Sequence, residues 1–173
     1  MAAQLPTQLS IRVLAHGDAA AFRELRLRAL RDHPEAFTSS FDEDVQKPLS
    51  ATVQRMAADD NVFWGAFVDG QICGMIGLTR EPRPKNRHKG DVVAMYVAPE
   101  CGRRGLGRSL LNALVEHARS VAKLEQLVLT VTRSNHAAIG LYKAAGFTTF
   151  GVEPRAIKVA GAYHDKEHMI LFL

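Results

Sequence analysis

The chain has 173 residues, of which 47% are hydrophobic and 23% are charged. This length and composition predict a single domain, residues 1–173, with a sizeable core, and they exclude an intrinsically disordered or fibrous protein. No apolar run approaches the ~18 residues of a membrane helix, and Met1–Arg12 lacks the pattern of a signal peptide, so we expect a cytoplasmic protein without a membrane partner. Cys73 and Cys101 belong to no metal-binding motif, so we expect neither a disulfide framework nor a bound metal.

The net charge of +4 depends on two basic segments. Arg80–Gly90 reads REPRPKNRHKG, in which five basic residues against one glutamate equal the whole excess. Arg103, Arg104 and Arg108 form the second segment. Positive charge of this kind favours a nucleic-acid or phosphate ligand. Because Arg80–Gly90 has no aromatic side chain for base stacking, we expect no nucleic-acid partner and a solvated loop there.

Hydrophobic patterning in the first half of the chain predicts a strand, a long helix and a hairpin. Asp69-Gly70 is typical of a type I′ turn and joins two β-rich runs. His33–Lys47 has no sustained period, which predicts a long loop of the kind that often carries function. The expected elements are a strand at 9–14, a helix after Asp18, a short helix at 50–58, and strands at 62–68 and 71–79.

The second half predicts a strand-helix-strand unit followed by a helix and two strands. Asp91–Ala98 is too apolar to have an exposed face, so we expect it at the centre of the sheet, parallel to Gln126–Thr132 through a right-handed crossover. The remaining elements are helices at 106–123 and 135–145 and strands at 147–159 and 167–172. Together these elements predict an α/β fold with an α+β mixed sheet of about seven mostly antiparallel strands and about four helices.

Between the central strand and the long helix, Pro99–Ser109 reads PECGRRGLGRS. Free N–H groups and the helix dipole make such a turn an anion site. A nucleotide P-loop fits poorly, because Arg108 replaces the lysine that reaches the phosphates and no strand ending in aspartate follows. A dinucleotide fingerprint from Gly105 and Gly107 would need its third glycine where Leu110 stands. A tight turn with solvated arginines remains the simple alternative.

The turn resembles motif A of the GNAT superfamily of acetyl-CoA-dependent N-acetyltransferases, in which a strand leads into [QR]-x-x-G-x-[GA] and a helix. Thr132–Phe147 (TRSNHAAIGLYKAAGF) continues the resemblance, because it is similar to the family's N-x-x-A-x-x-L-Y-x-x-x-G-F. The order of elements also matches, so the resemblance covers nearly the whole chain. It implies a GNAT-like acyl-CoA N-acyltransferase fold, a single N-acetyltransferase domain and acetyl-CoA as the acetyl donor.

The resemblance also implies which residues bind coenzyme A. The family's Gln or Arg position falls on Gly102 and its next glycine on Arg103, so one side-chain contact to the cofactor is in question. The Arg80–Lys89 loop is expected near the cofactor side, and Arg133 is a weaker candidate for the phosphates. The cofactor-binding candidates are Met95, Tyr96, Val97, Arg103, Arg104, Gly105, Leu106, Gly107, Arg108, Asn135 and Tyr142.

For catalysis, the resemblance assigns Tyr142 the role of giving a proton to the departing thiolate; the alternative is a helix tyrosine that only packs beside Leu141. The glutamate of the ribosomal-protein acetyltransferase branch corresponds to Thr130, which cannot act as a base. Asp91, Glu24 or a water chain could replace it. The candidate substrate contacts are Phe37, Glu43, Asp91, Tyr163 and Asp165, and the acids of Asp42–Asp44 would suit a cationic amine.

The sequence therefore predicts an enzyme that transfers an acetyl group from acetyl-CoA to a primary amine of a small molecule or peptide in a ternary complex. The alternative is a non-catalytic acyl-CoA binding or regulatory module, which Gly102 and the missing glutamate make plausible. The sequence leaves open the acceptor, the general base and whether the protein forms a homodimer.

Overall fold

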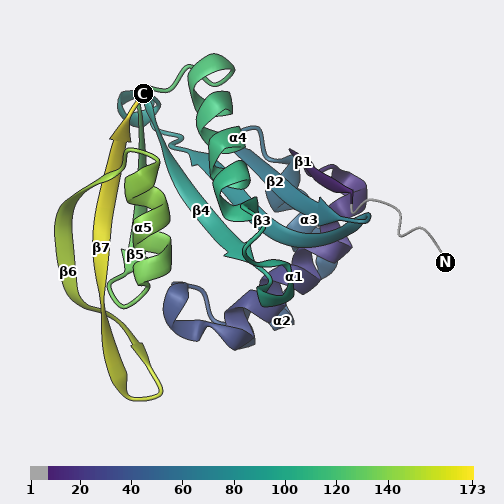
Figure 1. The fold of residues 1–173 in the computed structure, drawn as a ribbon, viewed down its shortest axis with the longest axis horizontal. Helices are drawn as coiled ribbons and strands as arrows, with labels where there is room; N and C mark the ends of the chain where they lie inside the picture. The colour runs from purple at the N-terminus through teal and green to yellow at the C-terminus, as the bar shows by residue number, and fades with distance from the viewer. Residues whose placement is uncertain (1–7) are drawn as a thin grey trace.

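A seven-stranded mixed sheet, in the order β1-β2-β3-β4-β5-β7-β6, runs through the computed structural model, which describes residues 8–173 (Figure 1). The strands are β1 (Leu9–Val13), β2 (Asn61–Val68), β3 (Gln71–Arg80), β4 (Lys89–Val97), β5 (Gln126–Thr132), β6 (Thr148–Val159) and β7 (Ala162–Phe172). The helices are α1 (Ala19–Asp32), α2 (Phe41–Gln46), α3 (Leu49–Ala57), α4 (Leu106–Ser120) and α5 (His136–Ala144). The predicted fold class is confirmed.

Helices cover both faces of the sheet. In Figure 1, α4 and α5 stand in front of it, and α1 and α3 lie behind it. The apolar face of α4 is buried through Leu110, Leu111 and Leu114. On the opposite face of the sheet, the rings of Phe22 and Phe63 pack with their centres 5.1 Å apart. No helix within residues 8–173 has the length and apolar character needed to span a bilayer.

The predicted connections around the centre of the sheet are confirmed. β2 and β3 form an antiparallel hairpin at Asp69-Gly70, where both residues have positive φ angles, as a type I′ turn requires. β4 is the fourth of the seven strands, and it pairs parallel to β5. Every second residue of β4 is buried, and the others are half-buried rather than exposed, as the apolar sequence of this strand indicated.

The predicted long loop over His33–Lys47 is wrong in part, because it contains a short helical turn at Pro34–Ala36 and the helix α2. A capping box starts α2: Ser40 Oγ accepts from the Glu43 backbone N–H at 3.2 Å, and the Glu43 carboxylate accepts from the Ser40 N–H at 3.0 Å. This reciprocal pair satisfies N–H groups that the start of a helix otherwise leaves free, which stabilises a helix too short to show a period.

Two further expectations are corrected. β7 begins at Ala162 rather than at residue 167, because Ala160 and Gly161 make a tight turn with positive φ angles and pairing with β6 starts directly after it. The Arg80–Lys89 loop is not near the glycine-rich turn. The loop leads into the start of β4 and the turn follows its end, and a strand of this length separates its two ends by roughly 30 Å at ~3.3 Å per residue. Within the loop, Arg87 pairs with Asp60 at 3.0 Å.

The parallel pairing of β4 and β5 ends early. It covers only Lys89–Asp91 against Gln126–Val128, and beyond this point the strands separate. Ala94 has a φ of 56° in the middle of β4, opposite the register shift in β3, so β4 is bulged there. A β-bulge bends its strand, and here it accompanies the V-shaped opening between β4 and β5, which we call the splay.

Candidate active site

A cavity of about 670 Å³, the large cavity, lies at the splay. It is bounded by β4, the glycine-rich turn, the start of α4 and α5, and its volume lies within the ~300–1,000 Å³ of typical ligand sites. Of the residues predicted from the sequence, those that line it are Phe37, Met95, Tyr96, Val97, Arg103, Gly105, Leu106, Gly107, Arg108 and Asn135. The structure thus brings together most of the predicted cofactor-binding set; Arg104 and Tyr142 do not line this cavity.

The start of α4 supplies the polar end of the large cavity. Gly105 precedes the helix with a φ of 72°, and no side chain caps the helix. The N–H groups of the first turn are therefore free, and the positive end of the helix dipole adds to them. Arg103 and Arg108 line the same end of the cavity. This combination fits phosphate groups.

Arg103 holds an unusual backbone conformation, with a φ of 61°. Left-handed angles suit glycine, so the arginine occupies a conformation that the glycine of the family pattern would adopt without steric cost. Gly102 has an ordinary φ of −62°, and a Cβ there would lie 3.1 Å from the Pro99 carbonyl oxygen. The departure from the family pattern thus places backbone strain at Arg103 in exchange for a cation at the cavity.

A second space, the inner cavity of about 240 Å³, contacts the large cavity at the splay. Its charged lining comes from α1, α3 and β7, and α5 lines it from the other face of the sheet. Phe37, Met95 and Asn135 line both cavities, so the two meet there. Tyr142 and Thr130 line the inner cavity. The Tyr142 ring packs edge-on against Phe147 at 5.9 Å, and burial raises the pKa of Tyr142 to about 12. Its hydroxyl therefore stays protonated at neutral pH.

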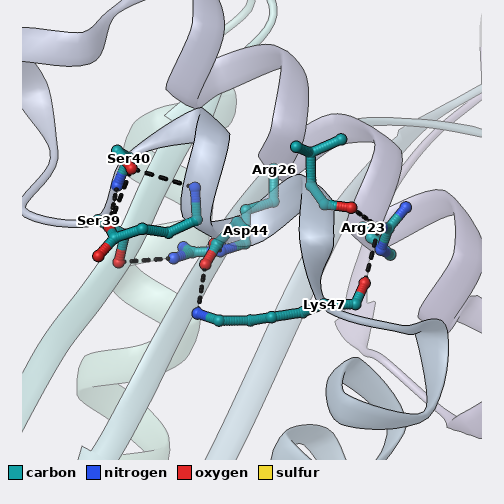
Figure 2. Close-up of polar contacts among 8 residues, drawn as sticks. Arg23, Arg26, Ser39, Ser40, Asp44 and Lys47 are labelled. Carbon is teal, nitrogen blue, oxygen red and sulfur yellow. Dashed lines mark hydrogen bonds and ion pairs between the residues drawn. The ribbon is translucent and has the colours of Figure 1, made fainter.

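An ion-pair cluster lies beside the inner cavity and reaches it through Arg26 and Ser39, and Figure 2 shows how its side chains converge on Asp44. Arg26 Nε and Lys47 Nζ each lie 2.6 Å from a carboxylate oxygen of Asp44, and Arg26 also donates to Ser39 Oγ at 3.1 Å. Burial raises the pKa of Asp44, but the hydrogen bond from Lys47 and the charge of Arg26 outweigh it and hold the pKa below 3.8.

The expected attraction of Asp42–Asp44 for a cationic amine is therefore not supported. Asp44 is already neutralised by Arg26 and Lys47. Glu43 caps α2 with its carboxylate, and Asp42 is exposed and lines neither cavity.

Several other predicted residues lie away from both cavities. Asp91 is half-buried where β4 still pairs with β5, and Glu24 is exposed on α1; neither lines either cavity. Tyr163 and Asp165 line a separate cavity beside the β6–β7 hairpin, with Arg133, whose guanidinium lies 3.5 Å from the Glu167 carboxylate. Among the described residues, no group of three or more His, Cys, Asp and Glu side chains could hold a metal.

Two residues of the inner cavity, Lys166 and Arg55, were not predicted from the sequence. Lys166 is 4% exposed, and burial lowers its pKa. In YHDKEHMIL both neighbours of the lysine are charged, so the alternation does not mark it as buried. The Ser40-x-x-Glu43 pattern, in contrast, is a readable capping signal that would have removed Glu43 from the candidates.

The sequence of this chain is similar to those of known acetyltransferases. Residues 22–147 match the model of the acetyltransferase (GNAT) family. The chain is 33% identical over 116 residues to the N-alpha-acetyltransferase RimI of Mycobacterium tuberculosis, which covers 66% of this chain and 70% of that protein. It is 31% identical over 155 residues to the mycothiol acetyltransferase of Thermobispora bispora, covering 88% of this chain and 50% of that protein. It spans 33% of the relative ML0378 of Mycobacterium leprae.

Solved structures give the same result. The GNAT-family acetyltransferase of Streptococcus pneumoniae has a TM-score of 0.87 at 26% identity, covering 96% of this chain and 100% of that chain. The fold of yncA from Salmonella typhimurium, solved with acetyl-CoA, has a TM-score of 0.80 at 24% identity, covering 96% of this chain and 94% of that chain. The chain belongs to the acetyltransferase (GNAT) family, and the family predicted from the glycine-rich turn and Thr132–Phe147 is confirmed.

The strain at Arg103 generates a prediction. Arg103→Gly should raise the free energy of unfolding by about 1 kcal/mol, because glycine adopts the left-handed angles without steric cost. It should also weaken acetyl-CoA binding, because a cation is lost from the phosphate end of the large cavity. Thermal unfolding and calorimetric titration measure the two effects, with Arg104→Gly as the control. Unchanged acetyl-CoA affinity in Arg103→Gly would exclude a phosphate contact by Arg103.

The Asp44 cluster generates a second prediction. Asp44→Asn should lower the free energy of unfolding at pH 7 by about 3 kcal/mol, because Arg26 loses its partner in a mostly buried setting. The folded-state pKa lies below the ordinary value of 3.8, so the wild-type advantage should be complete above that pH and shrink as the pH falls from there through the lower folded-state pKa. Urea unfolding at pH 7 and pH 3 measures this, with the exposed Asp42→Asn as the control. Equal effects of the two variants at pH 7 would contradict the prediction.

Proposed function

We propose that this chain transfers the acetyl group of acetyl-CoA to a primary amine of a small molecule or peptide, by direct attack in a ternary complex. The observation that carries the proposal is that the large cavity and the inner cavity meet at the splay. This arrangement allows donor and acceptor to approach one point from opposite faces of the sheet.

The donor side fits coenzyme A. The free N–H groups of α4, with Arg103 and Arg108, accommodate the pyrophosphate. Beyond Asp91, the β5-facing edge of β4 has no strand partner, so main-chain groups of Met95–Val97 can bond the pantetheine arm and the thioester oxygen. Asn135 Oδ1 accepts from the Ala138 N–H at 3.1 Å, so this residue also fixes the start of α5. Acetyl-CoA, when bound, supplies the activated acetyl group.

Tyr142 acts as the general acid. The amine nitrogen forms a bond to the acetyl carbon, the carbon–sulfur bond breaks, and Tyr142 gives its proton to the departing sulfur. Its place in the lining of the inner cavity supports this role, and its hydroxyl carries a proton at neutral pH.

The acceptor amine must become neutral without a carboxylate in the inner cavity, because no Asp or Glu side chain lines it; the acid that lines the large cavity is Glu35. An α-amine with a pKa near ~8 is about 10% neutral at pH 7, whereas a lysine side chain with a pKa near ~10.4 is neutral in only about 0.04% of molecules. Water in the cavity is left to remove the remaining proton. The site therefore favours an amine whose pKa is low or is lowered on binding.

The proposal includes a cytoplasmic location and a single domain over residues 1–173. Two free cysteines, Cys73 and Cys101, support the location, because thiols stay reduced in the cytoplasm. One sheet that contains strands from Leu9 to Phe172 supports the single domain. A homodimer stays a prediction.

A second candidate, a non-catalytic acyl-CoA binding module, is favoured by the lack of a carboxylate in the inner cavity. Release of free CoA thiol over a panel of amines separates the two functions. An enzyme releases thiol only when an acceptor is present. Tight acetyl-CoA binding with no turnover of any amine would contradict the enzyme and leave the binding module.

Tyr142→Phe should lower kcat about 100-fold, in the range usual for loss of a general acid. The dissociation constant of acetyl-CoA should change little, because Tyr142 does not line the large cavity. Steady-state kinetics and calorimetric titration measure the two quantities. A variant with wild-type kcat, or one that loses acetyl-CoA affinity and turnover in parallel, would contradict the assignment.

A further inference from the structure

Two basic side chains face the inner cavity without an acid partner among the described residues. Lys166, from β7, is 4% exposed, and its Nζ donates to Thr38 Oγ1 at 3.3 Å. Arg55, from α3, lines the same cavity and places its guanidinium 5.1 Å from the centre of the Phe63 ring. Burial lowers the pKa of both groups, which is the cost of holding unpaired positive charge away from water.

The charges nearby do not neutralise this pair. Arg26 also lines the inner cavity, but Asp44 balances its charge at 2.6 Å. The charge of Asp44 also raises the pKa of Arg55, and burial outweighs this effect. Glu153 stands opposite Lys166 in the β6–β7 pairing and raises the pKa of Lys166, yet its carboxylate lies 3.1 Å from His168 Nε2. The lining from β4, β5 and α5 carries no charged side chain. The cavity is therefore positive, on the opposite side of the sheet from the phosphate end of the large cavity.

We propose that the acceptor carries a carboxylate together with its amine, as an amino acid does, and that Arg55 and Lys166 hold that carboxylate in the inner cavity. The inference rests on the proposed function and names its substrate class. A guanidinium and a carboxylate form charge-assisted hydrogen bonds in a matching planar geometry. A volume of about 240 Å³ lies below the ~300–1,000 Å³ of typical ligand sites, which suits an acceptor of this size.

The same charges act on the reacting amine. A positive charge near an ammonium group lowers its pKa, which raises the fraction of neutral amine that can attack. Arg55 and Lys166 thereby compensate in part for the missing carboxylate base. They also repel acceptors that carry additional positive charge, such as polyamines, and this reverses the preference expected from the acids of Asp42–Asp44.

The test compares each standard amino acid with its α-amide as acceptor in the thiol-release assay, with spermidine as a cationic amine. We expect at least one amino acid to exceed its amide in kcat/KM by about tenfold or more, the loss that follows removal of one charge-assisted hydrogen bond. Arg55→Gln and Lys166→Met should abolish this preference, with a rise in KM for the amino acid that exceeds any change in KM for the amide by about tenfold or more.

Arg119→Gln, which removes an exposed charge from α4, is the matched control and should keep the preference. Lys166→Met preserves side-chain length and removes a buried charge, so its melting temperature should stay equal or rise. Equal turnover of amino acids and amides, or faster turnover of spermidine, would overturn the inference and leave the acetyltransferase function standing.

A binding measurement decides the inference if no amine is turned over. Amino acids are titrated calorimetrically into the protein saturated with free CoA, which has no acetyl group to transfer. Saturable binding that Arg55→Gln weakens about tenfold or more would support the carboxylate site even though the proposed function had failed. No binding by any amino acid would overturn it.

Discussion

The separation of β4 from β5 is the constraint on which the rest of the site depends. Three residue pairs hold the two strands together, and beyond Asp91 the edge of β4 that faces β5 has no partner. A sheet normally satisfies these backbone groups internally, so leaving them free is costly unless a ligand or water bonds them. The bulge at Ala94, with its left-handed backbone, is a second local cost at the same place. Backbone strain and unpaired groups at one point are typical of a site built for a ligand.

The splay also divides the recognition between two faces. On the α4 and α5 side, backbone N–H groups and the dipole of α4 provide an anion site that needs few particular side chains. In the inner cavity, side chains determine which acceptor binds, and Phe37, Arg55 and Lys166 come from three separate segments of the chain. The first arrangement suits a donor shared by a whole family, and the second suits an acceptor that differs from one member to another.

The elements that fix the donor side could be predicted from the sequence. The period of α4, the apolar run of β4 and the glycine-rich turn are local signals, and each of them lies where it was expected. The family resemblance rested on the same residues. α2 was missed because a capping box, rather than a periodic apolar face, starts it. β7 was predicted too short because its charged first half gains strand structure from pairing with β6.

The acceptor side was predicted much less well, for a physical reason. Whether a charged residue binds a ligand depends on what neutralises it, and the partners are distant in sequence. Asp44 was expected to attract an amine, but Arg26 from α1 already neutralises it. Lys166 lies in a run of charged residues, so its burial cannot be read from the sequence. It becomes visible only in the structure, where Lys166 is buried and its Nζ contacts Thr38. Phe37 was the one acceptor-side candidate that the structure placed in the inner cavity.

The central claim is that donor and acceptor meet at the splay from opposite faces of the sheet. Amide hydrogen exchange, followed by NMR with and without acetyl-CoA, tests it most directly because it reports on individual backbone N–H groups. Acetyl-CoA should protect the first turn of α4, Leu106–Arg108, and the Met95–Val97 segment of β4, and it should leave the α3 segment around Arg55 unchanged. Protection confined to the α1 and α3 side, or no protection of Met95–Val97, would contradict the account.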